Sequence, residues 1–379
     1  MPLDDEIILS KAEMNRYDRQ ILLPEFGLES QRKLKAAKVL VVGSGGLGCP
    51  LLLYLVAAGV GTIGIVEDDV VDESNLQRQV LFGKDDVGAF KTDAAKKRLE
   101  ALNPHVSITL YNTRFSSENA LDILKKYDVV ADGTDNFPTR YLINDAAVML
   151  QKPIVYASIY QFEGQVSVFN YTNDKGVLGP NYRDLHPTPP PPGLSPNCAA
   201  SGVLGVLPGI IGSIQANEVI KIITGIGTPL HGRLFMLDAL HFETRFFNII
   251  RRDDNPLNGK NPTMDSLIDY EFFCGEKPTS NVKEISGEEL VRWQQSGEIF
   301  QLIDVREPHE FDSNNIGAEL IPLATLATNT HKLSRDRKVV IHCHSGERSI
   351  RAIQVLEDNF GFQNLYNLKG GLVAYQALS

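Results

Sequence analysis

The chain has 379 residues, of which 43% are hydrophobic and 22% charged, and its formal net charge is −10. This length and composition are typical of a soluble globular protein with two or three domains. The negative charge argues against a general nucleic-acid or membrane-surface role, because polyphosphate backbones select basic faces. The charged N-terminus does not resemble a signal peptide, the apolar runs are too short to span a bilayer, and the four cysteines are widely scattered. We therefore expect a reduced, cytoplasmic protein.

In chain order, helical and strand patterns alternate up to residue 158. Hydrophobic periodicity predicts helices over 11–21, 51–58, 91–102, 119–126 and 138–150, and strands over 38–42, 62–66, 107–111, 128–131 and 153–158. Such alternation is typical of an α/β fold with a doubly wound, mostly parallel Rossmann-like sheet. Three further strand patterns follow, over 166–170, 233–238 and 242–250, and a long break separates the first from the second. They predict an antiparallel extension of the sheet.

The break contains four consecutive prolines, in the stretch HPTPPPPGLSPN over 186–197. Such a run cannot join a helix or the interior of a sheet, so it is a rigid linker, a ligand for an SH3-type domain or a crossover loop. We favour a crossover loop, because apolar, glycine-punctuated sequence resumes at once and ends in the pattern of a buried helix.

After residue 250 the periodicity fades, and the stretch 251–280 is expected to be a tail and linker. A second αβ pattern follows it, with a capped helix in ISGEELVRWQQSG, strands in FQLIDV and KVVIHC, and a helix over 348–359. This unit is large enough to fold independently. We expect one domain over 1–274, a linker over 275–282 and a second α/β domain over 283–379.

The stretch VLVVGSGGLGC, residues 39–49, is a β-branched apolar run followed by Gly43, Gly45 and Gly48 and then an apolar helical pattern. Glycine permits the φ angles and the close backbone approach that a bound phosphate requires. The helix N-terminus adds free N–H groups and the positive end of a dipole. The spacing predicts either a nucleotide-binding turn or a tight strand–helix turn without a ligand.

Residues further along the chain favour a nucleoside triphosphate. Glu67 ends the strand over 62–66, where an acid can bind ribose hydroxyls, although a dehydrogenase would share this feature. Arg78, in SNLQRQ, and Lys91 supply positive charge, and Asp135, in DGTDN, is a hard oxygen ligand suited to Mg²⁺. Hydride transfer needs neither a triphosphate clamp nor a metal, whereas attack of a carboxylate on an α-phosphate needs both.

These stretches resemble the E1-like adenylating enzymes of the molybdopterin-synthase and thiamine sulfur-carrier type, which are relatives of ubiquitin-activating enzyme. The matching pieces run in the same order from residue 16 to residue 238: RYDRQ, VLVVGSGGLGC, AGVGTIGIVEDD, SNLQRQ, VGAFKTDAA, DGTDNF, EGQVSVF, and CAASGVLG with IGSIQANEVIK. The resemblance implies adenylation, with ATP and Mg²⁺, of the C-terminal glycine of a small ubiquitin-fold sulfur-carrier protein that ends in Gly-Gly.

The same resemblance implies roles for single residues. The phosphates lie by Gly46 in the glycine turn, Glu67 binds the ribose, Asp135 holds Mg²⁺, and the phosphate clamp consists of Asn75, Arg78 and Lys91. Glu67 departs from the more usual Asp, and its longer side chain can still accept from ribose. Arg19 resembles an arginine that reaches into the neighbouring protomer's site, which implies a homodimer; taken alone, it would be a solvated helix charge.

Three of the four cysteines lie in the first expected domain, residues 1–274. Cys49 lies in an apolar helical pattern and is expected in the core. Cys198 follows the proline-rich loop and is either structural or a nucleophile; the resemblance implies that it forms a thioester or an acyl disulfide with the activated carrier. Many relatives hold a structural zinc with two C-x-x-C pairs, but the corresponding places here are NYRD and EFFC, which leave Cys274 alone. A tetrahedral zinc site needs four N or S ligands, so we expect no structural zinc.

The fourth cysteine, Cys343, ends a strand and opens the loop CHSGER, which leads to Arg348 at the start of a helix. Backbone N–H groups of such a loop, with the helix dipole, stabilise an anion on sulfur, and Arg348 adds positive charge. The alternative is an ordinary strand-to-helix turn. His342 and His344 flank the cysteine, but neighbouring residues of a strand point to opposite faces, which argues against a metal site.

The C-terminal pattern resembles a rhodanese domain in LIDVREPHEF, NIGAELIPL, the Cys343–Arg348 loop and NLKGGLVAY. The resemblance implies that Cys343 holds a persulfide and that Asp304 and Arg306 brace its loop. A cysteine-specific phosphatase could use a similar anion loop, but these motifs and the shortness of the loop favour sulfur. With NYRDLHPTPPPPG and DYEFFCG, the whole chain resembles the fused adenylyltransferase–sulfurtransferases that lack the zinc.

We therefore expect an ATP-dependent adenylyltransferase fused to a sulfurtransferase, whose product is a carrier thiocarboxylate. The sulfur would come to Cys343 from an upstream donor such as a cysteine desulfurase. One alternative is an E1-like enzyme that hands on a thioester from Cys198, and another treats the rhodanese unit mainly as a docking module. A dehydrogenase ranks last, because it leaves Arg78, Lys91 and Asp135 without a role. The pathway stays open among molybdopterin, thiamine, cysteine and thiolated-tRNA synthesis.

Overall fold

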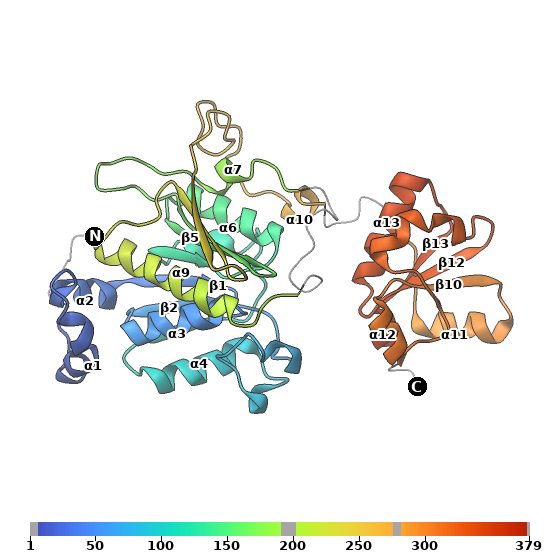
Figure 1. Ribbon diagram of the computed structural model, residues 1–379, viewed down its shortest axis with the longest axis horizontal. Helices are drawn as coiled ribbons and strands as arrows, with labels where there is room; N and C mark the ends of the chain where they lie inside the picture. The colour runs from blue at the N-terminus through green and yellow to red at the C-terminus, as the bar shows by residue number, and fades with distance from the viewer. Residues whose placement is uncertain (1–6, 191–201, 276–281, 377–379) are drawn as a thin grey trace. The chain divides into compact units, whose positions relative to one another are not determined.

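Strand β1 (Lys38–Val42) is the central strand of the N-terminal part of the protein, because both of its faces are apolar. Val39 and Val41 pack into one hydrophobic core, whereas Leu40 and Val42 pack into another on the opposite side, as the alternation of side chains along a strand requires. The structure is a computed structural model that describes residues 7–190, 202–275 and 282–376. It separates into two units between Cys274 and Gly275 (Figure 1).

The described strands of the first unit form an eight-stranded sheet in the order β3-β2-β1-β4-β5-β6-β7-β8. Five strands are parallel: β1, β2 (Thr62–Val66), β3 (Ser107–Tyr111), β4 (Val129–Asp132) and β5 (Ile154–Tyr160). The other three run antiparallel to their neighbours: β6 (Glu163–Phe169), β7 (Arg233–Asp238) and β8 (Glu243–Asn248). The predicted parallel sheet with an antiparallel extension is confirmed.

Helices cover both faces of the parallel strands, which is why these strands are apolar on both sides. One core contains residues of α2 (Gly27–Ala36), α3 (Gly48–Ala58), α4 (Lys91–Leu102) and α9 (Leu207–Thr224), and α9 packs along α3 (Figure 1). The other contains residues of α5 (Ala120–Leu124), α6 (Phe137–Met149), α7 (Tyr182–Leu185) and α10 (Tyr270–Phe273). The remaining elements of this unit are α1 (Lys11–Ile21) and the 3-10 turns η1 (Glu73–Asn75) and η2 (Lys84–Asp86).

Two expectations about this unit were wrong. Helix α2 was not predicted at all. The stretch 251–274, expected to be part of a tail and linker, packs on the first unit, where Asn255 and Tyr270 are buried. It combines hydrogen bonds between polar side chains, such as that of Asn255 with Asp184, with irregularly spaced apolar side chains that pack on the second core, so it shows no regular hydrophobic period.

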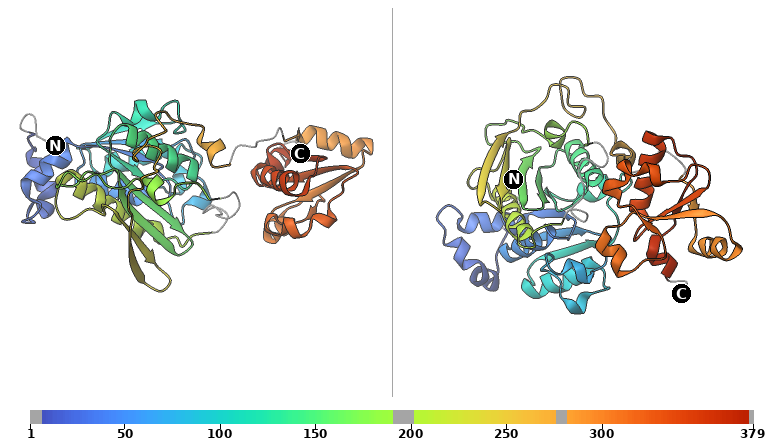
Figure 2. Two further views of the ribbon diagram at one scale, coloured as in Figure 1. Left: turned by 90° about the horizontal axis from the view of Figure 1, so that it is seen from above. Right: turned by 45° about the vertical axis from the view of Figure 1, so that its right-hand side comes forward.

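The described strands of the second unit form a five-stranded parallel sheet in the order β11-β10-β12-β13-β9. Its strands are β9 (Glu284–Ile285), β10 (Phe300–Asp304), β11 (Glu319–Leu320), β12 (Lys338–His342) and β13 (Leu365–Leu368). Its helices are α11 (Gly287–Ser296), α12 (Pro308–Ser313), α13 (Glu347–Phe360) and α14 (Gly371–Gln376), with 3-10 turns η3 (Leu323–Thr328) and η4 (Thr330–Lys332). Figure 2 shows α11 in orange and α13 in red on opposite sides of this sheet.

Helix α11 begins with the predicted cap, because the Ser286 and Glu289 side chains bond each other's backbone N–H groups. Among the described helices of both units, none combines the length and the apolar character that crossing a membrane requires.

Candidate active site

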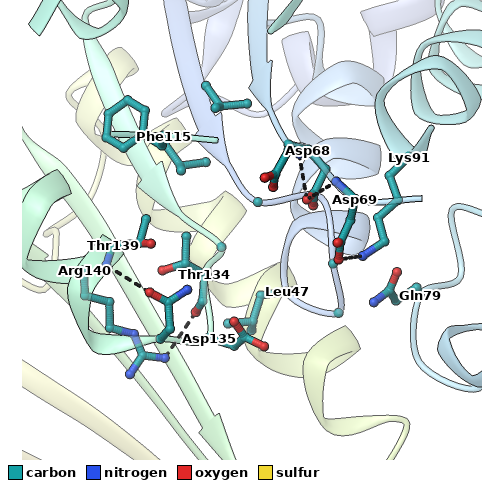
Figure 3. Close-up of a pocket in the computed structure, with 18 of the residues that line it drawn as sticks. Leu47, Asp68, Asp69, Gln79, Lys91, Phe115, Thr134, Asp135, Thr139 and Arg140 are labelled. Carbon is teal, nitrogen blue, oxygen red and sulfur yellow. Dashed lines mark hydrogen bonds and ion pairs between the residues drawn. The ribbon is translucent and has the colours of Figure 1, made fainter. Parts of the chain in front are cut away.

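A cavity of about 260 Å³ lies at the carboxyl ends of the parallel strands of the first unit (Figure 3). The chain leaves β1 toward one edge of the sheet and β4 toward the other, which opens a crevice between the turns that follow them. Polar and glycine residues from five segments line it: Gly43, Gly45 and Gly46 after β1, Glu67, Asp68 and Asp69 after β2, Gly133 to Asn136 after β4, Arg78 and Gln79, and Lys91.

The glycine turn is needed for the close approach of two backbone segments. Gly43 has a φ of 89°, and a Cβ atom there would lie 2.9 Å from the carbonyl oxygen of Gly133. A Cβ at Gly48 would collide with the carbonyl of Gly43, so Gly48 packs behind the turn and does not line the cavity. No side chain caps the first turn of α3. Its N–H groups and dipole can therefore bind an anion in the cavity.

Glu67 links the ends of β1 and β2. Its Oε2 atom accepts hydrogen bonds from the Ser44 backbone N–H at 2.9 Å and from the Ser44 hydroxyl at 3.2 Å. Its Oε1 atom accepts from the N–H groups of Asp68 and Asp69. The carboxylate is thus fixed at the rim of the glycine turn, within the cavity wall.

Lys91, the first residue of α4, brings a buried ammonium group into the cavity wall. Its side chain is 6% exposed, and Nζ donates to Oδ2 of Asp69 at 2.8 Å, whereas the Asp69 side chain is 70% exposed. Figure 3 shows this pair on one side of the cavity and Asp135 with Arg140 on the other. An exposed carboxylate is a partner that an incoming phosphate can replace.

The other side of the cavity is built by the turn between β4 and α6. Asn136 caps α6 by accepting from the Thr139 N–H at 2.9 Å, and Arg140 donates from Nη2 to the Thr134 carbonyl at 3.1 Å. Asp135 is at the start of this turn and lines the cavity. Its carboxylate faces Lys91 and Asp69 across the cavity (Figure 3).

The sequence analysis did not single out Gln79 and Arg140. Gln79 is the last residue of the SNLQRQ motif, and Arg140 lies shortly after the DGTDNF motif. Each is buried, and the Gln79 Oε1 and Arg140 Nε atoms have no hydrogen-bond partner within the described residues. Both side chains line the cavity. Polar atoms that are buried and unpaired are costly, so a ligand that pairs with them gains affinity.

Besides Gly48, three further expected site residues are not among those that line the cavity in the described part of the chain. Asn75 stands behind Arg78: its carbonyl accepts from the N–H groups of Arg78 and Gln79, and its side chain accepts from the Asp72 N–H. It therefore positions the residues that line the cavity. Arg19 lies exposed on α1, and its role in a neighbouring protomer stays a prediction. Cys198 lies outside the described residues.

An ion-pair network stands where relatives were expected to hold zinc. Arg183 donates from Nε and Nη2 to the two carboxylate oxygens of Asp145 at 2.8 and 2.6 Å, and the Tyr270 hydroxyl donates to the same carboxylate at 2.8 Å. The guanidinium carbon lies 5.1 and 4.9 Å from the ring centres of Tyr141 and Phe273. This cluster joins the turn that contains α7 to α6 and α10. Within the described ranges, no group of three or more His, Cys, Asp or Glu side chains is placed to hold a metal ion.

Cys49 is a core residue, as predicted. It is fully buried, its thiol donates to the Ser44 carbonyl at 3.2 Å, and burial raises the pKa of Cys49 to about 12. Cys274 is buried as well. Neither thiol has the exposure of a nucleophilic cysteine.

The second unit places Cys343 at the bottom of a short loop between β12 and α13. The sulfur is fully buried and accepts a hydrogen bond from the Gly346 N–H at 3.2 Å. The Ser349 hydroxyl lies 3.6 Å from the sulfur and 2.6 Å from Oδ1 of Asn367. His344 is exposed at the mouth of the loop. The Gly346 N–H thus donates to the sulfur, and the Ser349 hydroxyl, whose proton goes to Asn367 in this arrangement, lies close enough to turn toward an anionic sulfur.

Two arginines at this end of the sheet are each paired with a carboxylate. Arg348 donates to both oxygens of Glu310 at 2.7 Å, and these bonds are the main reason that the pKa of Glu310 falls to about 2. Arg306, buried, donates from Nε and Nη2 to Asp304 and from Nη2 to the Asn314 carbonyl. The Asp304–Arg306 pair ties the end of β10 to the loop after it.

His342 points away from Cys343, as the alternation along a strand predicts. Its ring is fully buried, Nε2 lies 3.8 Å from Oδ2 of Asp304, and both ring nitrogens have no hydrogen-bond partner within the described residues. Burial lowers the pKa of His342 below its ordinary value.

Comparisons with known proteins agree with this two-site arrangement. The ThiF family model matches residues 17–258, and the rhodanese-like domain model matches residues 286–378. A Mycobacterium tuberculosis protein named "Probable adenylyltransferase/sulfurtransferase MoeZ" is 48% identical over 375 residues, which cover 97% of this chain and 94% of that protein. The "Adenylyltransferase and sulfurtransferase MOCS3" of Mus musculus is 41% identical over 409 residues, which cover 99% of this chain and 88% of that protein.

Other matches cover about two thirds of the chain. The "Sulfur carrier protein adenylyltransferase" of Thermus thermophilus is 54% identical over 266 residues, which cover 70% of this chain and 98% of that protein. Among solved structures, PaaA matches with a TM-score of 0.54 at 26% identity, covering 66% of this chain and 77% of that one. MccB of E. coli, crystallised with ATP, shares the fold with a TM-score of 0.56 at 23% identity, covering 66% of this chain and 76% of that one. The chain therefore belongs to the ThiF family and has a C-terminal rhodanese-like domain.

Proposed function

We propose that this chain activates the C-terminal glycine of a small ubiquitin-fold sulfur-carrier protein by adenylation and then converts it into a thiocarboxylate. The chain is an adenylyltransferase and a sulfurtransferase, as are the two relatives that it matches over nearly their whole length. The observation on which the proposal rests most is the presence, in one chain, of an anion-binding cavity after β1 and an anion-stabilised cysteine after β12.

In the first step, a carboxylate oxygen of the carrier attacks the α-phosphorus of ATP. The bond from phosphorus to pyrophosphate breaks, and an acyl-adenylate forms. The glycine turn and the first turn of α3 bind phosphate oxygens through N–H groups, while Arg78 and Lys91 compensate their charge. Lys91 changes partner from Asp69 to phosphate. A ribose hydroxyl replaces the Ser44 hydroxyl, which is free to rotate, on the carboxylate of Glu67.

We assign Mg²⁺ to Asp135. Magnesium sites with nucleotides use one or two carboxylates together with phosphate oxygens and water, so one of the carboxylates that line the cavity, that of Asp135, would be enough to hold the ion. When bound, the ion neutralises phosphate charge and stabilises the leaving pyrophosphate. Asn136, beside it, holds the start of α6 in place.

In the second step, the terminal sulfur of a persulfide on Cys343 attacks the acyl carbon, and AMP leaves with the electron pair. The product is an acyl disulfide between the carrier and Cys343. An external thiol then attacks the Cys343 sulfur and releases the carrier thiocarboxylate, and a second molecule of thiol reduces the mixed disulfide and restores Cys343; an intermediate of the carrier on Cys198 is the alternative route. A persulfide supplied by a cysteine desulfurase starts the next cycle.

The proposal is tested by incubating the full chain with ATP, Mg²⁺, a carrier that ends in Gly-Gly and a sulfur donor, and reading the intact mass of the carrier. We expect one oxygen to be replaced by sulfur in the wild type and not in Cys343→Ala. If the carrier is adenylated but gains no sulfur from any donor, and a thioester on Cys198 accumulates instead, the E1-like alternative is correct.

We further propose a homodimer in which Arg19 contributes to the partner's cavity. This is tested by mixing two inactive variants, Arg19→Ala and Lys91→Gln. If Arg19 acts across the dimer, mixed dimers contain one intact cavity and recover carrier-dependent pyrophosphate exchange. If Arg19 acts within its own chain or only on the surface, mixing restores nothing beyond the sum of the two variants.

A further inference from the structure

The two arginine side chains near Cys343 are each already paired with a carboxylate. Arg348 forms a bidentate pair with Glu310, and the two side chains are 32% and 25% exposed. Arg306 forms a bidentate pair with Asp304, and these side chains are 3% and 0% exposed. Each guanidinium therefore faces a carboxylate in the geometry that would otherwise serve a bound oxyanion.

Glu310 is held in this place by its own helix as well as by Arg348. Its Oε2 atom also accepts from the Glu307 N–H at 3.0 Å, in the capping box of α12. The carboxylate does not have to be recruited when a substrate arrives, and an anion that seeks Arg348 must displace it. Because the Arg348 bonds hold the pKa of Glu310 near 2, the carboxylate stays charged at physiological pH.

The hydrogen-bond donors that remain around the Cys343 sulfur can compensate a single negative charge. The Gly346 N–H and the Ser349 hydroxyl lie within reach of the sulfur, and the N-terminus of α13 adds its dipole. Asn367 holds the Ser349 hydroxyl, and the Asn367 amide in turn donates to Glu284 at 3.1 Å. These donors stabilise a thiolate or a persulfide anion. The Arg348 guanidinium also interacts with the sulfur, but it is shared with Glu310, so its charge is not free to compensate a second negative charge.

We infer that Glu310 determines which sulfur donor loads Cys343: it excludes dianionic oxyanion donors such as thiosulfate and leaves the site to persulfides. This inference rests on the proposed function of Cys343 as the sulfur-holding residue. Thiosulfate brings two negative charges and releases sulfite, also an anion, between Glu310 and Cys343. A persulfide brings at most one negative charge, located on the sulfur that the loop donors already bind.

The loading step is a displacement at sulfur without net oxidation. The Cys343 thiolate attacks the terminal sulfur of a donor R–S–SH and forms a new S–S bond. The old S–S bond breaks, and the donor leaves as the thiolate R–S⁻ with the electron pair. The proton of the persulfide stays on the transferred sulfur, and the leaving thiolate takes a proton from water.

The test measures sulfur loading of Cys343 in the full chain, by intact mass, without ATP or carrier. Three donors are compared: thiosulfate, free cysteine persulfide, and a cysteine desulfurase charged with cysteine. The variants are the wild type, Glu310→Gln and Asp312→Asn. Glutamine keeps a carbonyl oxygen for the Glu307 N–H, and Asp312, exposed on the same helix, removes the same charge away from the Arg348 pair.

We expect the wild type to load from one or both persulfide sources faster than from thiosulfate, and the two persulfide arms tell a free persulfide from a protein-bound one. Glu310→Gln is expected to raise the second-order rate with thiosulfate about tenfold and to leave the persulfide rates within about twofold. Asp312→Asn should change neither. Thermal unfolding of each variant shows that the domain is folded.

Several results would overturn the inference. They are equal wild-type rates with thiosulfate and persulfide, a thiosulfate rate that Glu310→Gln does not raise, or the same gain in Asp312→Asn. The wild-type comparison decides the first of these even if Glu310→Gln fails to fold. A chain that gains sulfur on Cys343 from none of the donors contradicts the proposed function itself, and a chain that loads freely from thiosulfate contradicts the role of Glu310 alone.

Discussion

Arg183 and Asp145, 38 residues apart in the chain, form a bidentate ion pair in which the side chains are 3% and 0% exposed. Asp145 also accepts a hydrogen bond from the Tyr270 hydroxyl, so one carboxylate joins α6, α7 and α10. Removing two charges from water is costly, and the pair repays that cost only when both members are present. This pair and its neighbours lie in the segments where the sequence resemblance led us to expect a zinc site in relatives.

We expect Asp145→Asn to lower the free energy of unfolding of the first unit by about 3–5 kcal/mol, because it leaves the Arg183 guanidinium buried without a counter-charge. Calorimetry of the full chain measures this. The single tryptophan, Trp293, lies in the second unit, and its fluorescence is an internal control that should not shift. Asp174→Asn, at an exposed carboxylate, is the matched variant. A loss below about 1 kcal/mol, the value typical of exposed pairs, would contradict the prediction.

We also predict that the purified chain contains no stoichiometric zinc and that a strong chelator leaves its thermal unfolding unchanged. Hydrogen bonds and ion pairs hold the turn at α7 to the segment up to Cys274: Asp184 accepts from the Asn255 amide at 2.7 Å and from the Arg252 N–H at 2.9 Å. A structural zinc contributes directly to folding, so its removal would lower the melting temperature. Metal analysis that finds one zinc per chain would refute the prediction.

Lys91 should be essential for adenylation and dispensable for folding of the unit. Lys91→Gln removes the ammonium that we expect to compensate the phosphate charge, and we expect carrier-dependent ATP–pyrophosphate exchange to fall by about two to three orders of magnitude. The matched control is Lys97→Gln, an exposed lysine on the same helix. If Lys91→Gln keeps more than about a tenth of the wild-type exchange rate, Lys91 is not part of the phosphate clamp.

The stability of the second unit should fall in mild acid because of His342. Burial lowers the pKa of His342, and the Asp304 carboxylate opposes this shift. Arg306, which is paired with Asp304, adds a smaller lowering effect. The unfolded chain therefore takes up a proton on this ring at a higher pH than the folded chain does. Stability is fully present above the ordinary histidine range and is lost as the pH falls through it, by up to about 1.4 kcal/mol per pH unit.

Trp293 fluorescence during denaturant unfolding reports this unit by itself, and the free energies at about pH 7.5 and pH 5.5 can be compared. His342→Leu should remove most of the difference between the two values. The prediction fails if the acid-induced loss is the same with leucine at this position.

Local pattern was enough to predict much of the fold. Helices α1 and α4 and strands β1, β2, β3 and β7 begin and end at the predicted residues, because the periods of buried side chains are properties of a short window of sequence. Local motifs also pointed to several residues that line the cavity, among them Glu67, Lys91 and Asp135, since the carboxyl ends of parallel strands meet at one edge of the sheet. Cys343 was placed correctly at the start of its loop for the same reason.

What the sequence by itself determined about this protein is the order of its elements, its two-unit organisation and the residue types that its sites contain. The tertiary structure decided which of these side chains face each other. Arg348 meets Glu310, and Arg183 meets Asp145, each across 38 residues; Asn75 lies behind Arg78, and Gln79 and Arg140 enter the cavity. A charged or polar side chain has many possible partners along the chain, and only the path of the backbone brings one of them within hydrogen-bonding distance.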